Sequence, residues 1–252
     1  MCRLPGDKVV ALQADIWQVL SKDKATLATI QSLLDRLNFA ARIIPAGRIF
    51  ARRLARATAK VNKSHHLVRL SLGLKEDLRM WLSFLEEFKD TQLWRTPWCT
   101  SQQLQLFTDA SGREGFGAIL DRQWCAGKWP NAWGRHGLTK NITVLEMFPI
   151  VLSLHLWPQV LADKRITFWS DNMAVVQANC PVLVGLLREL VRVCLLRNVE
   201  FRAWHVQGVK NVAADALFRF QWTKFRPACP QAMEEMTPFR AEWWRLVQWS
   251  KG

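Results

Sequence analysis

The order of short apolar runs and longer amphipathic stretches in the second half of the chain restricts its fold most strongly. Residues 104–130 contain three strand-like runs separated by turn residues, and the segments up to residue 220 then follow as helix, strand, helix, strand and helix. Short strands interleaved with long helical patterns are typical of proteins in which helices cover a sheet. The sequence therefore predicts a mixed α/β architecture for residues 102–220.

Four acidic residues lie at the ends of these elements. Asp109 ends the first strand-like run, and Glu146 lies in the first turns of an otherwise apolar helix. Asp171 ends the run ITFWS, and Asp215 begins the last helix. An acid among apolar neighbours is costly unless it is paired, exposed at the end of an element or bound to a cation. A cap or a turn explains Asp109 or Asp171 alone, whereas four such acids together indicate a shared site.

Strand ends are where open α/β sheets bind ligands. If the strands of Asp109 and Asp171 are adjacent and parallel, both acids point into one crevice, with Glu146 facing them. Clustered carboxylates repel one another, and oxygen ligands without Cys or His suit Mg²⁺ or Mn²⁺. We therefore expect two such ions, which could activate water and stabilise the leaving oxygen in phosphodiester cleavage.

The motifs around these acids resemble ribonuclease H, in the branch attached to retroelement reverse transcriptases. They read Phe-Thr-Asp-Ala-Ser-Gly, Leu-Glu, Ser-Asp-Asn and His-Val-Gln-Gly-Val-Lys-Asn-Val-Ala-Ala-Asp. The resemblance covers residues 102–220 and implies a mixed five-stranded sheet with flanking helices that cleaves the RNA strand of RNA–DNA hybrids. It also implies roles for single residues: Asp109, Glu146, Asp171 and Asp215 as metal ligands, His205 in proton transfer or product release, Asn211 in steadying the loop of His205, and Asn172 as a nucleic-acid contact.

The first part of the chain, residues 1–95, is expected to be mostly helical. Apolar residues recur at helical spacing in 30–41, and two further helices are predicted at 49–59 and 75–88. LLDRLNFAARIIPAGRIFARRL and KEDLRMWLSFL are similar to the segment before ribonuclease H in tyrosine-recombinase retrotransposons of the DIRS and Ngaro type. This similarity implies a thumb or connection segment that grips a duplex. The remaining segments are a linker at 96–101 and a tail at 221–252, whose Trp243, Trp244 and Trp249 are expected to dock on the body of the protein.

Positive charge is concentrated in this first part. The chain has 35 Lys and Arg against 21 Asp and Glu, and residues 36–69 contain nine of these basic residues and no acid. Like charges repel unless a partner neutralises them, so we expect contacts with nucleic-acid phosphates that are salt-sensitive and independent of sequence. The residues chosen for this role are Arg48, Arg52, Arg53 and Arg56.

Several activities and locations are excluded or left open by composition. The chain has no Tyr, which excludes a recombinase tyrosine, and it lacks the aromatic-Asp-Asp motif of polymerases. It has no signal peptide and no run of 18 apolar residues, so we expect an intracellular protein, nuclear or cytoplasmic, without a membrane partner. Covalent or non-covalent association with a polymerase domain stays open. Two alternatives remain: a catalytically inactive, retroelement-derived nucleic-acid-binding protein, and a DNA-cutting transposase or integrase, for which the last acid should be Glu.

Overall fold

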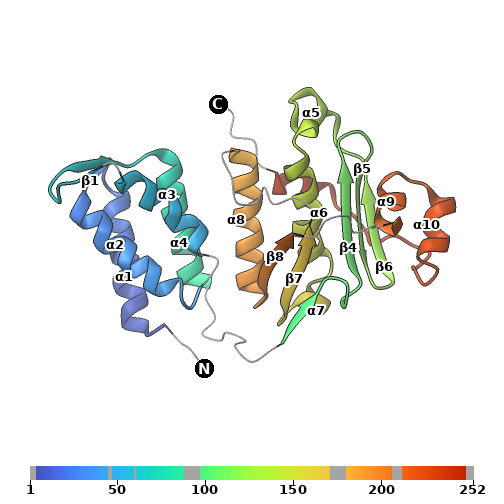
Figure 1. The fold of residues 1–252 in the computed structure, drawn as a ribbon, viewed down its shortest axis with the longest axis horizontal. Helices are drawn as coiled ribbons and strands as arrows, with labels where there is room; N and C mark the ends of the chain where they lie inside the picture. The colour runs from blue at the N-terminus through green and yellow to red at the C-terminus, as the bar shows by residue number, and fades with distance from the viewer. Residues whose placement is uncertain are drawn as a thin grey trace. The chain divides into compact units, whose positions relative to one another are not determined.

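The protein is described by a computed structural model with a mixed α/β fold (Figure 1). Its chain forms two compact units, Met1–Trp94 and Arg95–Gly252. In the described part of the chain, no helix is both long and apolar enough to cross a membrane. The described residues are 4–44, 47–59, 61–87, 97–170, 180–205 and 212–247.

Helices dominate the described part of the first unit, as the hydrophobic periodicity predicts. A short antiparallel strand pair that the sequence did not indicate joins them. The apolar stripe expected in residues 30–41 is buried, with Ile30, Leu33 and Leu37 almost fully covered. The elements are α1 (Gly6–Leu20), β1 (Lys24–Thr26), α2 (Leu27–Ala40), α3 (Arg48–Thr58), β2 (Leu67–Arg69) and α4 (Leu72–Glu87).

The start of α3 depends on a close approach between Gly47 and Trp81. Gly47 caps the helix, and a Cβ at this position would overlap the indole of Trp81. Trp81 is fully buried beside Phe84, whose ring packs against Phe50 of α3. These aromatic contacts attach α3 to α4 through one side of the helix.

In the second unit, the short strand β3 comes before a three-stranded antiparallel meander, after which helices and the strands β7 and β8 alternate as predicted. β7 and β8 are parallel neighbours. The elements are β3 (Trp98–Thr100), β4 (Leu106–Ser111), β5 (Gly115–Leu120), β6 (Gln123–Gly127), α5 (Asn131–Arg135), η2 (Leu138–Lys140), α6 (Ile142–Leu156), α7 (Pro158–Leu161), β7 (Arg165–Ser170), α8 (Pro181–Leu196), β8 (Glu200–His205), α9 (Val212–Phe218), α10 (Trp222–Ala228) and η4 (Ala241–Leu246).

The single five-stranded sheet implied by the resemblance is not what the described strands form. They form two three-stranded sheets, β4-β5-β6 and β3-β7-β8, so the expected pairing of the Asp109 strand with the Asp171 strand is not present among the described residues. Instead, β3, in the segment expected to be a linker, pairs in parallel with the first half of β7. Arg165 and Arg202 place their guanidinium carbons 4.5 and 3.9 Å from the ring centre of Trp98, which holds β3 on this sheet.

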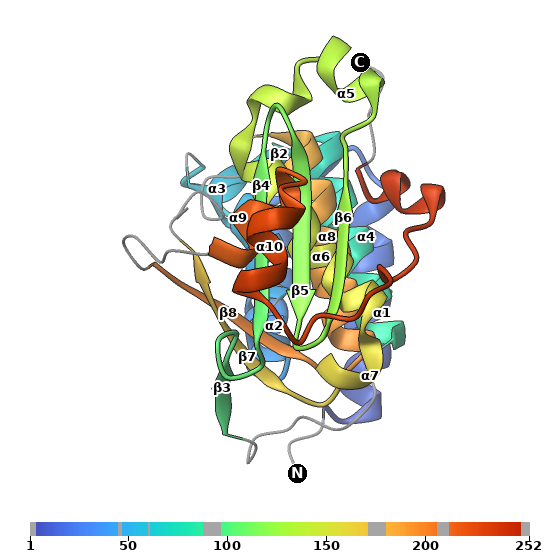
Figure 2. The same cartoon turned by 90° about the vertical axis from the view of Figure 1, so that its right-hand side faces the viewer.

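The β4-β5-β6 sheet is covered on both faces. Alternate residues of a strand point to opposite faces, and one set, including Ala110, Phe116 and Ala118, packs in the core that contains α6 and α8. The other set, including Ile119 and Trp124, packs against α9 and α10. Figure 2 shows α9 and α10 in front of this sheet, with α6 and α8 behind it.

The C-terminal tail packs onto the second unit, as expected for Trp243 and Trp244. The indole of Trp244 stacks on Phe148 of α6 with ring centres 5.3 Å apart, and it also contacts Phe116. Trp243 contacts the ring of Phe239, and Trp249 lies outside the described residues. This tail therefore contributes to the hydrophobic core.

Candidate active site

Asp109 lies near the carboxyl end of β4, on the face of the sheet that α9 covers. Its partner across the ladder is Gly117 of β5, and directly opposed residues point to the same face. A Cβ at Gly117 would lie only 3.2 Å from the carbonyl oxygen of Ala214 and 3.1 Å from the backbone nitrogen of Phe218. The absence of a side chain at Gly117 thus lets α9 contact the sheet beside the half-buried Asp109.

Asp215 comes to this face in the first turn of α9. Its side chain is 46% exposed, and Oδ1 lies 3.0 Å from Nε of Arg219, one helical turn further along. The carboxylate is therefore accessible to solvent and already faces a cation.

Glu146 comes from the opposite side of the sheet, on α6. Asn141 caps this helix by accepting a hydrogen bond from the backbone nitrogen of Val144. A Cβ at Gly112, just after β4, would overlap the carbonyl oxygen of Thr139 and contact Leu145. The beginning of α6, with the half-buried Glu146, is therefore held at the carboxyl end of β4.

Of the remaining predicted site residues in the second unit, only His205 lies among those that the structure describes. The backbone of His205, the last residue of β8, is paired in register with Ser170 of β7. Parallel strands end at the same edge of their sheet. Asp171 and Asn172 follow Ser170 directly in the chain, but they lie outside the described residues, as does Asn211.

The metal expectation can be compared with the donors that are present. Among the residues that the structure describes, no three His, Cys, Asp or Glu side chains form a group that could hold a metal ion. Asp171, the fourth expected ligand, is not among them. Asp109, Glu146 and Asp215 offer carboxylate oxygens, which suit hard divalent cations such as Mg²⁺. The type of donor atom in these three residues therefore suits the expected ion.

The four arginines chosen for phosphate contact are not equivalent. Arg48, Arg52 and Arg56 of α3 are exposed. Arg53 instead lies with Nε 3.3 Å from Oδ2 of Asp77, whose side chain is only 5% exposed. Because a buried carboxylate needs its cation, Arg53 links α3 to α4, and its contact with phosphate stays a prediction.

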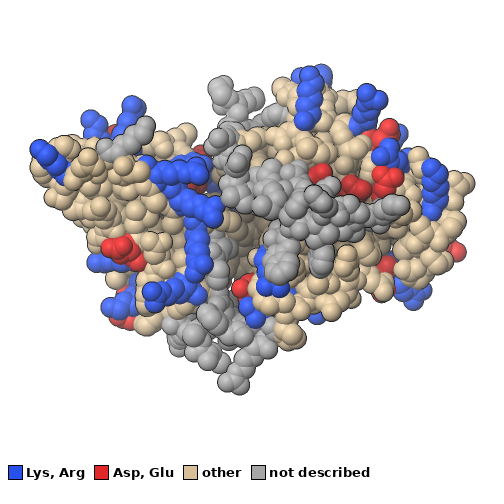
Figure 3. All heavy atoms as spheres, viewed as in Figure 1, with Lys and Arg blue, Asp and Glu red and all other residues tan. Residues whose placement is uncertain are grey.

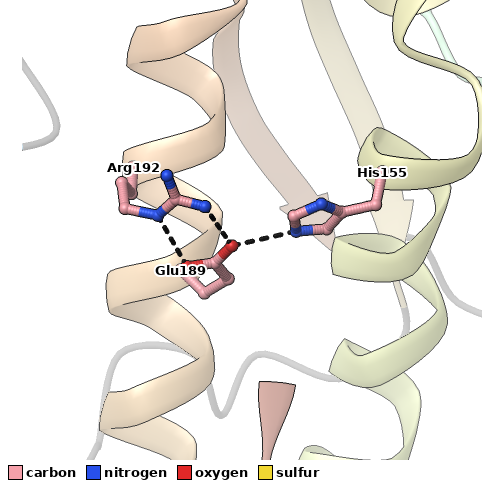
Figure 4. Close-up of polar contacts among 3 residues, drawn as sticks. All are labelled: His155, Glu189 and Arg192. Carbon is pink, nitrogen blue, oxygen red and sulfur yellow. Dashed lines mark hydrogen bonds and ion pairs between the residues drawn. The ribbon is translucent and has the colours of Figure 1, made fainter. Parts of the chain in front are cut away.

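A charged cluster that sequence reasoning missed connects α6 to α8 (Figure 4). Nε2 of His155 lies 2.9 Å from Oε1 of Glu189, and Arg192 donates two hydrogen bonds to the same carboxylate. Burial raises the pKa of Glu189, but the hydrogen bonds from Arg192 and His155 outweigh this effect and lower the pKa from 4.5 to about 2. The spacing of Glu189 and Arg192 is visible in the sequence, whereas the proximity of His155 requires the fold.

Comparison with known proteins adds no relative: no protein-family model and no curated protein matches the chain. An assignment of function therefore depends on the residues themselves and on the elements that carry them.

Proposed function

We propose that this chain is a metal-dependent endonuclease that hydrolyses the RNA strand of RNA–DNA hybrids, derived from a retroelement reverse transcriptase. The observation that carries the proposal is the packing of α6 and α9 on either side of β4, which brings Glu146 and Asp215 to the strand of Asp109. In this proposal β4-β5-β6 and β7-β8 correspond to the antiparallel and parallel parts of a ribonuclease H-like sheet, with β3 as an addition.

Asp109, Glu146, Asp171 and Asp215 would hold two Mg²⁺ or Mn²⁺ ions. When bound, these ions would supply Lewis-acid chemistry and lower the pKa of a water molecule. The chain's own residues have other tasks: the carboxylates fix the positions of the reacting groups, and His205 accepts or returns a proton at the imidazole. Asn172 and Asn211 would bind and orient the substrate and the loop of His205.

A cysteine nucleophile is disfavoured at two of the described positions. Burial raises the pKa of the Cys125 and Cys194 thiols to about 12. Because the thiolate is the nucleophilic form, these two cysteines stay protonated and unreactive at neutral pH. Activated water remains the nucleophile that the proposal needs.

A cleavage assay tests the proposal directly. The purified chain should cut the RNA strand of a labelled hybrid in Mg²⁺, and Asp109→Asn or Asp171→Asn should lower the rate by at least about a hundredfold, since even residues outside the ligand shell can contribute that much. Hybrid binding should persist in both variants. Asp35→Asn, an exposed acid on α2 with the same change of charge, is the matched control and should cut normally.

The same assay decides between the alternatives. The exposed arginines of α3 and the ion pair that occupies Asp215 favour, as a second candidate, a nucleic-acid-binding protein without catalysis. A folded wild-type chain that binds the hybrid but cuts nothing in Mg²⁺ or Mn²⁺ would establish that candidate. Preferential cutting of duplex DNA would point instead to a transposase or integrase.

A further inference from the structure

Three arginines of α3 form an inclined row, which we call the line, on the exposed side of the helix. Residues four apart on an α-helix are about 6 Å apart along the axis and rotated by only about 40°. Arg48, Arg52 and Arg56 follow this spacing, so their line is about 12 Å long. The buried residues Phe50 and Leu54 lie on the opposite side of the helix.

These three arginines carry uncompensated charge. All three are exposed, and none makes an ion pair with a residue in the described ranges. Figure 3 shows Lys and Arg side chains gathered along one face of the first unit, over the region of α3 and α4. An evenly spaced row of one sign suits an extended partner of the opposite sign.

The neighbouring Arg53 is held in a different direction. It is rotated by about 100° from Arg52, and its guanidinium reaches the buried Asp77 of α4. The guanidinium lies directly against the backbone of α4 at Gly73, where a Cβ would overlap Nη1 of Arg53. The carboxylate of Asp77 and the backbone at Gly73 together fix the position of the Arg53 side chain. We call these two groups the seat of Arg53.

We propose that Arg48, Arg52 and Arg56 follow the phosphates of one strand of a bound hybrid, and that Arg53, seated on Asp77 and Gly73, fixes the rotation of α3 that directs the line outward. The proposal rests on the nucleic-acid part of the proposed function. One strand of a duplex carries a phosphate about every 3.4 Å along the axis, so the line spans three to four nucleotides. Arginine favours phosphate as a partner because its planar fork can donate two parallel hydrogen bonds.

The first experiment tests the line by the salt dependence of binding. Fluorescence anisotropy would follow a labelled RNA–DNA hybrid in EDTA, with the full chain, at a series of KCl concentrations. Each phosphate contact contributes about 0.9 to the slope of log affinity against log salt. The triple variant Arg48→Gln, Arg52→Gln, Arg56→Gln should therefore lose about 2 to 3 from the slope and bind at least about tenfold more weakly.

The second experiment tests the seat without changing any charge. Gly73→Ala favours the helix but displaces the flexible end of Arg53. Electrostatics alone predicts equal or tighter binding, because the released Arg53 is an additional cation. A positioning role predicts binding weakened by about three- to tenfold, with the salt slope reduced in parallel. Gly185→Ala in α8, where a Cβ would meet nothing within 4 Å, is the matched control and should bind normally.

A second variant shows whether weaker binding by Gly73→Ala results from the displaced Arg53 or from misfolding. Asp77→Asn raises the net charge by one, so simple attraction again predicts tighter binding and the seat predicts weaker binding. Circular dichroism would verify that each variant is folded. Equal or tighter binding by both folded variants would overturn the positioning role of Arg53.

The remaining outcomes separate this inference from the catalytic proposal. An unchanged salt slope in the triple variant would overturn the line, as would displacement of the hybrid by polyglutamate as readily as by unlabelled hybrid. If Asp109→Asn binds the hybrid normally but no longer cuts it, the proposed active site is supported. The line of arginines is then supported or overturned by the salt dependence of the triple variant. Absence of hybrid binding by the wild type would overturn both the line and the nucleic-acid part of the proposed function.

Discussion

The two units of the molecule carry the same excess of positive charge but differ in how their described arginines are paired. Residues 1–94 carry 16 Lys and Arg against 9 acids, and residues 95–252 carry 19 against 12. The excess of seven is the same in both, but in the second unit several arginines are tied to partners. Arg165 pairs with Glu200, Arg192 with Glu189 and Arg219 with Asp215.

The first unit shows the contrast within a single helix. Arg53 of α3 is tied to the buried Asp77, whereas Arg52 beside it is exposed without an ion pair in the described part of the chain. Net charge therefore does not locate a binding surface. In our proposal the surface is located by arginines that no acid in the described ranges compensates, and the following predictions test how far this distinction extends.

The largest expected effect tests whether the two units unfold independently of each other. Phe148 is fully buried at the centre of the aromatic cluster of the second unit. Phe148→Ala should lower the free energy of unfolding of that unit by about 3 to 5 kcal/mol. Urea titration followed by circular dichroism should then show an earlier transition for the second unit alone. A single unfolding transition that shifts for the whole chain would contradict independent unfolding of the two units.

A smaller effect should distinguish paired from unpaired arginine. The folded pKa of Glu189 is about 2, below its ordinary value of 4.5, because Arg192 and His155 favour the carboxylate. Stabilisation by this cluster is therefore complete above a pH of about 5 and is lost as the pH falls toward 2. The difference between 4.5 and about 2 corresponds to about 3 kcal/mol, and partial exposure to solvent reduces this stabilisation to roughly 2 to 3 kcal/mol.

Glu189→Gln tests this pH dependence. The variant should be less stable than the wild type at pH 7, and the difference should shrink as the pH approaches 3, measured by urea unfolding at each pH. Arg52→Gln, which removes an unpaired arginine, should change stability by less than about 0.5 kcal/mol throughout. A wild type and Glu189→Gln with parallel pH profiles would contradict the role assigned to the cluster.

The elements of this fold could be predicted because their signals are local. Ile30, Leu33 and Leu37 recur at helical spacing and are buried, and the apolar run that became α6 packs in the core. The strand β3 could not be predicted. Its three residues carry no pattern of their own, and its pairing with β7 depends on Trp98 meeting arginines more than 60 residues further along the chain.

The candidate site was predictable in its residue types but not in its geometry. Asp109, Glu146 and Asp215 could be identified by their positions at the ends of apolar elements. That α9 approaches the strand of Asp109 depends on Gly117, whose importance appears only once the register of β4 and β5 is known. Likewise, Arg53 differs from Arg52 only through Asp77, which is 24 residues away in the sequence.

The smallest expected effect concerns the arginine nearest to the candidate site. Arg219 faces the carboxylate of Asp215, and both side chains are nearly half exposed. If Asp215 ligates a divalent cation, it must exchange Arg219 for that ion, and the nearby positive charge opposes the exchange. Arg219→Gln should therefore bind Mn²⁺ about two- to tenfold more tightly, since such a charge acts through solvent at a few ångströms.

Electron paramagnetic resonance of Mn²⁺ during a titration measures this affinity without a cleavage step. Arg240→Gln provides the control, because Arg240 is also an exposed arginine facing a nearby acid, Glu242, but lies outside the candidate site. Its Mn²⁺ affinity should equal that of the wild type. If Arg219→Gln bound Mn²⁺ no more tightly than Arg240→Gln, Arg219 would form only an ordinary surface ion pair with Asp215. Arg219 would then resemble Arg165 and Arg192, which are paired with acids of the second unit, and this would sharpen the contrast with the exposed arginines of α3.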